Sequence, residues 1–340
     1  MTGYGRAELI KVLAPVDKVE EVEKVIKSGA DELYCGVLSR DWLLKYTIAA
    51  LNRRPHPACN LKSFKELKEC VEIAHSYDVP VALTVNEHYY TNEQYPILLD
   101  YIEKALDAGV DSLIISDIGL LLTLRDMSLG VKLHISTGGT TFNSETVKFY
   151  QELGASRVQL DRHLTIQEIK EIHKEISGIE TGVFILNSKC ANIDGFCTFL
   201  HFASSDPAYN NACMLPYEVH VESTEDDEKK IIAGTRQQVW QRFHIDDRPC
   251  GVCALYEFNE IGLSYAKIVG RGYPLQKKVT DVKFVRSMLN FLARKPTREE
   301  FRKTARKFYV LTYQRPCRIT MCYYPEVMLD GESTLHNKDR

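Results

Sequence analysis

Apolar residues along this chain alternate between two spacings, one typical of helices and one typical of short strands. The stretch PILLDYIEKALDAG, residues 96–109, repeats its apolar residues at the three- and four-residue intervals that one face of a helix requires. The next apolar run, SLIISD at residues 112–117, is short and rich in β-forming residues. A helix followed closely by a strand is the repeating unit of α/β proteins, so this pattern predicts that class of fold.

A short phrase marks the points where a helix gives way to the following strand. It consists of a helix end, a glycine, a small or apolar residue, Asp or Ser, and then a strand. The copies are SGADELY from Ser28, AGVDSLI from Ala108, LGASRVQ from Leu153 and IGLSYAK from Ile261. Because glycine suits the left-handed backbone that closes a helix, each copy predicts a helix end and a strand start.

Eight strands are predicted when the whole chain is divided in this way. They lie near IKVLAPV (Ile10), ELYCGV (Glu32), PVALTVN (Pro80), SLIISD (Ser112), KLHIST (Lys132), RVQLDR (Arg157), GVFILN (Gly182) and YAKIVGR (Tyr265). Helices intervene between most of them, so we expect an α/β fold of the TIM-like (β/α)8 barrel type. An open doubly wound sheet is the alternative, but the glycine-rich phosphate-binding fingerprint that would favour it is missing after the first strand.

The barrel domain is expected to span residues 8–295, with one long insertion. Residues 187–264 exceed the length of a single β/α connection, so we expect a cysteine-rich insertion after strand 7, with a strand at Glu218 and an acidic, solvated turn at Thr224. Loops that follow the carboxyl ends of barrel strands build the active site, so the insertion should lie on that face. Residues 296–340 should form a helical C-terminal tail that is packed on the barrel or partly mobile.

The overall charge limits the partners that this protein can have. Its 340 residues carry a formal net charge of −3, which argues against non-specific nucleic-acid binding over the whole surface. Residues 294–318 nevertheless hold nine basic and two acidic residues, which indicates either a solvated helix face or a phosphate-contacting surface. The sequence shows no secretory leader and no apolar run of about 18 residues, so we expect a cytoplasmic location and no membrane span.

Five of the ten cysteines lie in the insertion, with the spacing Cys190-x6-Cys197-x15-Cys213 followed by Cys250-x2-Cys253. Zinc sites usually take ligands in close pairs, and only the last two cysteines have that spacing. Wide spacing suits an iron–sulfur cluster, whose iron atoms accept thiolates from separate loops. Zinc binding and buried free thiols are the alternatives.

Several stretches resemble the peptidase U32 family, the collagenase-like proteins. The stretch VFILNSKCANIDGFC carries the Cys-x4-Gly-x-Cys signature of that family at Cys190, Gly195 and Cys197. The stretch LAPVDKVEEVEKVIKSGADELYCG resembles its opening β/α unit, and SDIG, LHIST, LGASRVQLDRHLTIQEI and KIVGR resemble later blocks. The resemblance covers most of residues 10–295.

The chain departs from the family pattern at two acidic positions, which are Gly182 and His163 here. It also lacks the His-Glu-x-x-His zinc motif and the Gly-x-Ser-x-Gly nucleophile elbow. These departures weaken the interpretation of this chain as a peptidase.

The resemblance implies a four-iron, four-sulfur (4Fe-4S) cluster on four cysteines. The expected ligands are Cys190, Cys197, Cys213 and Cys250, with Cys253 as the rival for the fourth position. Counting back from KIVGR without gaps, the cysteine that the family usually has before the next helix falls on Cys250, which is therefore narrowly favoured. The tail cysteines, Cys317 and Cys322, have no role that the sequence assigns.

The resemblance also implies hydroxylation without molecular oxygen, with prephenate as a candidate oxygen donor. The substrate would be an RNA nucleobase or a small aromatic molecule that resembles a quinone precursor. The chain is as compact as the family members of the quinone pathway, which implies a possible second family member as heterodimer partner. A collagenase-like peptidase and a non-catalytic, cluster-bearing partner subunit are the alternative functions.

Polar residues at the predicted strand ends are the remaining candidates for the site. Asp117, His134, Lys267 and Arg271 are the candidate catalytic residues, and Asn86, Ser136 and Arg162 are the candidate substrate-binding residues. Arg and Lys suit a dicarboxylate, because guanidinium groups bind carboxylates with two parallel hydrogen bonds. Each has a structural alternative: His134 as a core histidine, Asp117 as a helix cap, and Lys267 and Arg271 as an ion pair with a barrel carboxylate. Tyr89 and Tyr90 indicate either an aromatic wall or a surface loop.

Overall fold

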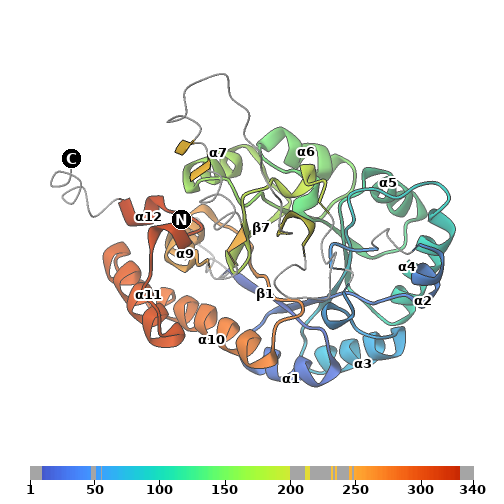
Figure 1. The fold of residues 1–340 in the computed structure, drawn as a ribbon, viewed down its shortest axis with the longest axis horizontal. Coiled ribbons are helices and arrows are strands. Elements are labelled where there is room, and N and C mark those ends of the chain that lie inside the picture. The colour runs from blue at the N-terminus through green and yellow to red at the C-terminus, as the bar shows by residue number, and fades with distance from the viewer. Residues whose placement is uncertain are drawn as a thin grey trace, which may run out of the picture.

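Eight parallel strands close into a barrel at the centre of the molecule (Figure 1). The computed structural model describes residues 10–46, 51–54, 56–199, 211–214, 231–232, 234–235, 245–246 and 249–329. The strands are β1 Lys11–Pro15, β2 Glu32–Cys35, β3 Val81–Val85, β4 Ser112–Ile115, β5 Lys132–Ile135, β6 Arg157–Gln159, β7 Glu180–Leu186 and β10 Tyr265–Ile268. They pair in chain order from β1 to β7, and β10 closes the ring between β7 and β1. The barrel prediction is therefore confirmed, and the open sheet is excluded.

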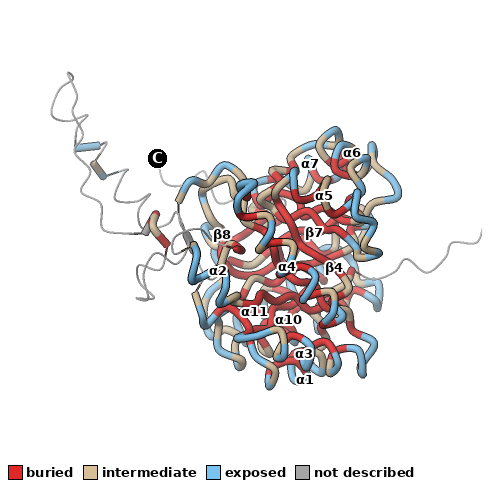
Figure 2. The backbone as a smooth tube through the Cα atoms, turned by 90° about the vertical axis from the view of Figure 1, so that its right-hand side faces the viewer, coloured by how far each residue is buried: buried red, intermediate tan, exposed pale blue. Residues whose placement is uncertain are grey.

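Helices surround the barrel and connect successive strands (Figure 1). They are α1 Val19–Lys27, α2 Arg40–Lys45, α3 Phe64–His75, α4 Tyr95–Asp107, α5 Ile118–Met127, α6 Ser144–Glu152, α7 Ile166–Glu175, α9 Leu255–Ile261, α10 Leu275–Leu292, α11 Arg298–Tyr313 and α12 Glu326–Leu329. Figure 2 shows that the buried backbone is concentrated in the barrel, whereas the outer faces of the helices are exposed. This arrangement follows from the helical spacing of their apolar residues.

The glycine of each repeated phrase closes a helix as predicted. Gly29, Gly109, Gly154 and Gly262 have φ values of +110°, +88°, +97° and +86°, a region that other residues rarely adopt. In each case the following strand begins three residues later, at Glu32, Ser112, Arg157 and Tyr265. The phrase therefore sets where four of the eight strands start.

Ion pairs cross the barrel at the amino-terminal ends of its strands. Arg157 at the start of β6 donates two hydrogen bonds to Glu32 at the start of β2, at 2.8 and 2.9 Å. A third hydrogen bond, of 2.9 Å, runs from Arg157 to Glu180 at the start of β7. Because β2 and β6 lie on opposite sides of the ring, the Arg157–Glu32 pair spans the interior. The pair fills the interior at the amino-terminal ends of the strands.

Replacing Arg157 with Met should lower the free energy of unfolding by about 3–5 kcal/mol, because Glu32 would remain buried without its cation. Urea denaturation measures this loss. Lys148→Met is the matched control, because Lys148 pairs with Glu145 at 2.7 Å on an exposed face of α6. That variant should lose less than about 1 kcal/mol. Equal losses in the two variants would contradict the structural role of the Arg157–Glu32 pair.

The segment after α10 packs on the outside of the barrel. In α11, Phe308 and Tyr309 lie against Phe284 of α10, with ring centroids 6.0 and 6.2 Å apart respectively. The chain then returns to the barrel wall, where the hydroxyl of Tyr324 donates a hydrogen bond of 3.0 Å to the carbonyl of Phe184 on β7. The C-terminal segment is thus part of the wall beside β7.

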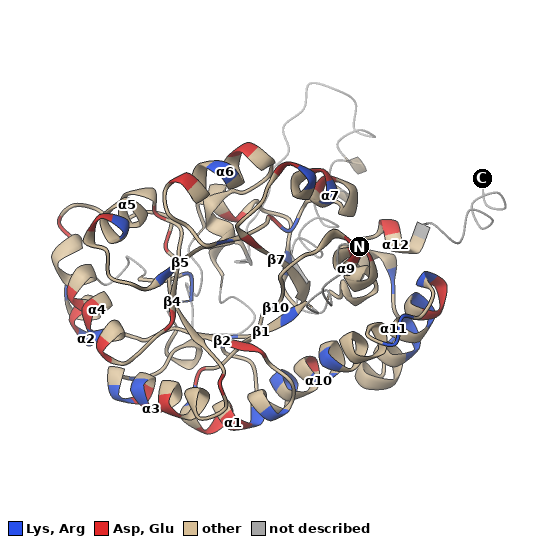
Figure 3. Ribbon diagram, turned by 180° about the vertical axis from the view of Figure 1, so that it is seen from behind, with Lys and Arg blue, Asp and Glu red and all other residues tan. Residues whose placement is uncertain are grey.

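The basic stretch that includes α11 makes structural ion pairs as well as an exposed surface. Arg302 donates a hydrogen bond of 2.7 Å to Glu257 in α9, and Arg298 lies 3.2 Å from the same carboxylate. Lys303 and Lys307 are exposed, and Figure 3 shows Lys and Arg residues recurring along α10 and α11. Part of this charge therefore serves to fix α11 against α9.

The insertion after β7 begins with a short antiparallel pair. β8 (Lys189–Cys190) pairs with β9 (Ile245–Asp246), and the 3-10 turn Asp194–Phe196 follows β8. The predicted strand at Glu218 and the acidic turn at Thr224 lie outside the described residues.

Within the described part of the chain, no helix is both long and apolar enough to cross a membrane.

Candidate active site

A pocket opens at the carboxyl ends of the strands, the face on which barrel enzymes hold their active sites. Five of the seven strand-end residues that the sequence nominated line it: Asn86, Ser136, Arg162, Lys267 and Arg271. They come from different strands and meet because the carboxyl ends of all eight parallel strands lie on one face of the barrel. The pocket is therefore assembled from residues far apart in the chain.

Arg271 follows β10 and lies buried in the pocket wall. Its guanidinium donates hydrogen bonds to the hydroxyl of Thr84, at 2.8 Å, and to the side-chain oxygen of Asn52, at 3.2 Å. Gly36 makes this possible, because a Cβ at that position would overlap the guanidinium. The two contacts leave N–H donors of a planar, five-donor group for a ligand. Arg271 is thus a preorganised anion-binding group held by neutral partners.

Arg162 joins the barrel to the cysteine-rich insertion. Its Nε donates a hydrogen bond of 2.8 Å to Asp194, its Nη1 donates to the carbonyl of Ser188, and its guanidinium carbon lies 4.3 Å from the centre of the Phe184 ring. The hydroxyl of Thr137 donates a hydrogen bond of 3.0 Å to the same Asp194 carboxylate. Asp194 therefore fixes the signature loop, defined as residues 190–197, onto the pocket rim.

Gly195 explains the glycine of the signature in physical terms. A Cβ at this position would lie 2.5 Å from the carbonyl oxygen of Gly138 and would also overlap the methyl group of Thr140. Only glycine lets the signature loop approach the backbone after β5 so closely. The loop therefore lies directly on the pocket, which is lined by Gly138 as well as Asp194.

Lys267 lies near the carboxyl end of β10 and has a relative exposure of 7%. Its Nζ lies 4.7 Å from the centre of the Tyr34 ring and 5.7 Å from that of Phe184. Burial, followed by the positive charges of Arg271 and Arg162, lowers the pKa of Lys267 to about 7. Lys267 does not form the ion pair with a barrel carboxylate that the structural alternative supposed, within the described residues.

Asp117 and His134, two of the predicted catalytic residues, do not line the pocket. The carboxylate of Asp117 accepts a hydrogen bond of 2.6 Å from the backbone N–H of Leu120, so it caps α5 as the structural alternative proposed. His134 is buried deeper in the barrel, 4.0 Å from Glu32. Burial and the charge of Arg157 hold the pKa of His134 well below its usual range, so its imidazole is neutral.

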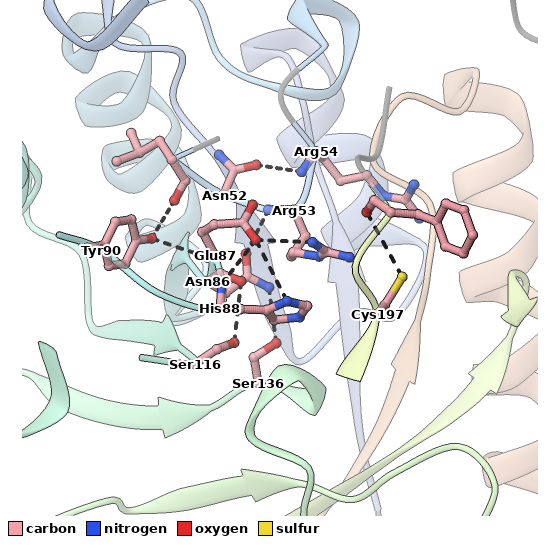
Figure 4. A network of polar contacts seen from close by, with 12 residues as sticks. Asn52, Arg53, Arg54, Asn86, Glu87, His88, Tyr90, Ser116, Ser136 and Cys197 are labelled. Carbon is pink, nitrogen blue, oxygen red and sulfur yellow. Dashed lines mark hydrogen bonds and ion pairs between the residues drawn. The ribbon is translucent and has the colours of Figure 1, made fainter. Parts of the chain in front are cut away.

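Sequence reasoning missed several pocket residues, above all Arg53 and Arg54. The guanidinium of Arg53 donates a hydrogen bond of 3.0 Å to Glu87, and its backbone N–H donates to the side chain of Asn86 at 3.4 Å (Figure 4). Figure 4 shows these contacts tying residues 51–54 to the loop after β3, where His88 also reaches the pocket. No local pattern marks a pair of arginines in a loop, whereas Asp194 could have been nominated from its place inside the signature.

The cysteines fall into two sets. Burial, and then the charges of Cys190 and Cys197, raise the pKa of Cys213 to about 11, so these three thiols lie close enough to affect one another. The second set is Cys250, Cys253, Cys317 and Cys322. The backbones of Cys250 and Cys322 form an isolated parallel β-bridge, and the N–H of Cys250 donates a hydrogen bond of 2.9 Å to the carbonyl of Met321. Both thiols are free.

The donor chemistry fits a cluster, although no complete ligand group is assembled among the described residues. The thiols of Cys190 and Cys250 each accept a backbone N–H, from Asn192 at 3.3 Å and from Val252 at 3.5 Å, and such bonds stabilise cluster sulfurs. Burial raises the pKa values of Cys190 and Cys213, and the positive charges of Arg162 and Arg53 respectively offset part of that rise. In the described ranges, no three Cys, His, Asp or Glu residues are placed to hold a metal ion together.

Comparison with known proteins places these features in a family. The chain is 27% identical to the "tRNA hydroxylation protein P" of Haemophilus influenzae, over 65% of this chain and 46% of that protein. It is 26% identical to the "23S rRNA 5-hydroxycytidine C2501 synthase" of Escherichia coli, over 66% of this chain and 31% of that protein. It is also 27% identical to a "Collagenase" of Porphyromonas gingivalis, over 60% of this chain and 48% of that protein.

The chain spans about half the length of the first curated relatives it matches. Among solved structures, it is similar to "the U32 peptidase Mk0906", with a TM-score of 0.42 and 13% identity over 55% of this chain and 72% of that one. A model of peptidase family U32 matches residues 17–326, which include seven of the eight barrel strands, the signature loop and the segment that returns to β7. The chain therefore belongs to peptidase family U32.

Proposed function

We propose that this protein hydroxylates a nucleobase of RNA in the pocket at the carboxyl end of its barrel. The observation that carries the proposal is the charge of that pocket. Arg53, Arg54, Arg162, Lys267 and Arg271 line it, together with the single carboxylate of Asp194. Such a site suits an anionic ligand, and the names of relatives that act in tRNA and rRNA hydroxylation support RNA as the substrate class.

Two exposed aromatic side chains on neighbouring loops support a nucleobase rather than a peptide. Tyr89 follows β3 and is 70% exposed, and Phe196 in the signature loop is 71% exposed. Proteins that read single-stranded RNA stack unpaired bases on such rings and bind phosphates with nearby Arg and Lys residues. Inside the pocket, the amide of Asn86 donates a hydrogen bond of 3.0 Å to the hydroxyl of Ser136. That pair can offer both a donor and an acceptor to the edge of a base.

We also propose that Cys190, Cys197, Cys213 and Cys250 hold a 4Fe-4S cluster beside this pocket, with Cys253 as the rival fourth ligand. A cluster with cysteine ligands supplies single-electron transfer. The residues of the chain itself would bind and orient the reactants: Arg271 would hold a carboxylate, and Phe184 and Tyr34 would exclude water from Lys267. Prephenate is the proposed oxygen donor, because a dianion suits a pocket that four guanidinium groups line.

The rival functions differ in what they require of the pocket. A peptidase needs an activated nucleophile, but the hydroxyl of Ser136 accepts from the amide of Asn86 and has no imidazole as its partner among the described residues. A small aromatic substrate resembling a quinone precursor would occupy the same pocket without using Tyr89 and Phe196. A non-catalytic partner subunit would bind the cluster but would depend on a second family member for turnover.

Deleting the gene should remove one hydroxylated nucleoside from cellular RNA, which mass spectrometry of digested RNA measures. The wild-type gene should restore that nucleoside, and Arg271→Met should not, because the pocket would lose its anion-binding group. Tyr77→Ser is the matched control, since Tyr77 is an exposed aromatic residue at the end of α3, away from the pocket. Unchanged RNA with altered quinones would favour the small aromatic substrate, and activity only with a second family member would favour the partner subunit.

A further inference from the structure

Lys267 occupies a position that a β-bulge aims at the pocket. On β10 it pairs with Phe184 of β7, but the next residue, Ile268, pairs with Leu186, so Ile185 is an extra residue in the partner strand. Bulges of this kind re-aim side chains and are frequent beside active sites. The bulge lies at the level of the pocket, which both Lys267 and Phe184 line.

The amine of Lys267 has no hydrogen-bond acceptor and no carboxylate partner among the described residues. Its Nζ lies 4.7 Å from the centre of the Tyr34 ring and 5.7 Å from that of Phe184. The charged groups that affect it most are mostly positive: Arg271 after β10, Arg157 on β6 and Arg162 after β6, with the carboxylate of Asp194 in the signature loop acting in the opposite direction. Burial and the repulsion of three cations disfavour the ammonium form of Lys267, and the two aromatic faces offset only part of that cost.

A second buried lysine shows what a structural lysine looks like in the same barrel. Lys278 of α10 is 1% exposed, and it pairs with Asp17 and, at 2.7 Å, with Glu21. Its charge is compensated in the way that buried charges normally are. Lys267 is almost as buried but lacks such partners, so structural charge pairing does not account for it.

We propose that Lys267 is a nucleophile that forms a reversible imine with the carbonyl carbon of an anionic oxo acid bound in this pocket. The inference rests on the proposed function only in taking this pocket as the reaction site, and it names the chemical class of the co-substrate. Prephenate, the proposed oxygen donor, belongs to that class. The chemical class of the co-substrate follows from two features of the pocket. An amine without a partner suits a carbonyl carbon, and the guanidinium groups beside it suit an anion.

The step balances without any further reagent. The neutral Nζ adds to the carbonyl carbon to form a carbinolamine, and loss of water then leaves a C=N bond to Lys267. The two amine hydrogens depart with the carbonyl oxygen as that water, and hydrolysis reverses the step. A pKa of about 7 leaves roughly half of the amine neutral at neutral pH, about 1,000-fold more than for an ordinary lysine.

Arg271 can hold the carboxylate of the oxo acid while its carbonyl faces Lys267, whereas the guanidinium of Arg162 is already paired with Asp194 and the Ser188 carbonyl. Arg271 lies four residues after Lys267 in the chain and uses two of its N–H groups for Thr84 and Asn52. Both guanidinium groups line the same pocket as the lysine. A carboxylate bound in this way would also offset the positive charge around the amine before the imine forms.

Reductive trapping tests this inference on the purified protein. Purified protein is incubated with pyruvate at pH 7, reduced with borohydride, digested and analysed by mass spectrometry. We expect one adduct per chain, on Lys267, with Lys278 and the exposed Lys148 unmodified as internal controls. Lactate, which lacks the carbonyl, should give none, and acetone, which lacks the carboxylate, should give much less than pyruvate. Lys267→Arg should abolish trapping while the protein keeps its thermal transition.

Three outcomes would overturn the inference: no adduct, an adduct spread over surface lysines, or trapping that persists in Lys267→Arg. Failure of the proposed function has a different signature. If trapping occurs on Lys267 but deletion of the gene leaves every RNA nucleoside unchanged, the imine stands and RNA is the wrong substrate. If RNA hydroxylation is restored by Lys267→Arg, the hydroxylation stands and the imine is wrong.

Discussion

Replacing Cys190, Cys197 or Cys213 with Ala should leave the anaerobically purified protein with almost no iron. The wild-type protein should contain iron and acid-labile sulfide in equal amounts, about four of each per chain. The three thiols affect one another's charge and lie beside Arg162 and Arg53, so removing one deprives the cluster of a ligand that no neighbour replaces. Iron and sulfide assays measure the loss, and so does the absorbance of the cluster at about 400 nm.

The control variants are Cys35→Ala and Cys70→Ala, which should keep their iron. Both thiols are fully buried in the apolar core, on β2 and α3, and burial raises their pKa values. Neither can reach the signature loop without unfolding the barrel. One equivalent of zinc without sulfide in the wild-type protein would contradict the cluster and favour the zinc alternative.

The fourth ligand is tested by comparing Cys250→Ala with Cys253→Ala. Cys250 should matter more, because its thiol accepts a backbone N–H in the same way as that of Cys190. The thiol of Cys253 is buried beside Arg306 of α11. A larger iron loss in Cys253→Ala would show that the register assigned from the sequence is wrong by three residues.

Truncating Lys267 or Arg271 to Met should lower turnover while the bound iron stays unchanged. If each side chain contacts the reactants in this pocket as proposed, each loss should cost about 2–4 kcal/mol of transition-state stabilisation, or roughly a 30- to 1,000-fold fall in rate. Steady-state rates and iron content measured on the same preparation check this. Wild-type rates in both variants, or loss of iron in either one, would contradict the assignment of these residues to the pocket.

The stability of Lys267→Met separates a catalytic defect from misfolding. Burial holds the pKa of Lys267 near 7 in the folded state, against about 10.4 in an unfolded chain. Below about pH 7 the amine is protonated in both states, and only the folded protein bears the cost of the desolvated charge. The Met variant should therefore gain stability there, by up to about 5 kcal/mol, and the gain should fade as the pH rises toward 10.

The barrel could be predicted from the sequence because its signals are local. Helical spacing, a closing glycine and a short β-rich run recur within about 30 residues, the usual length of a β/α unit. Parallel strands also bring their carboxyl ends together, so Asn86, Ser136 and Lys267 could be grouped before any contact was known. Alternation along a strand predicts the side of the strand but not the depth in the barrel. His134 and Ser136 share a side of β5, yet only Ser136 reaches the pocket.

Other parts of the site depend on contacts that no local pattern encodes. Arg53 and Arg54 enter the pocket because hydrogen bonds hold their loop to Asn86 and Glu87, more than 30 residues away. The choice between Cys250 and Cys253 depends on which thiol the following turn leaves facing the insertion. The sequence allows Asp117 to be either a catalytic residue or the cap of a helix, and its hydrogen bond from Leu120 shows that it caps α5.

The C-terminal segment that lies on β7 affects the order in which the protein can be completed during synthesis. The hydroxyl of Tyr324 donates to the Phe184 carbonyl, the N–H of Tyr323 donates to the Cys250 carbonyl at 3.1 Å, and Lys189 donates to the Cys322 carbonyl at 2.7 Å. All eight barrel strands have been synthesised by Ile268, but these partners follow more than 50 residues later. A nascent chain can therefore close its barrel while the wall beside the cysteines is still incomplete.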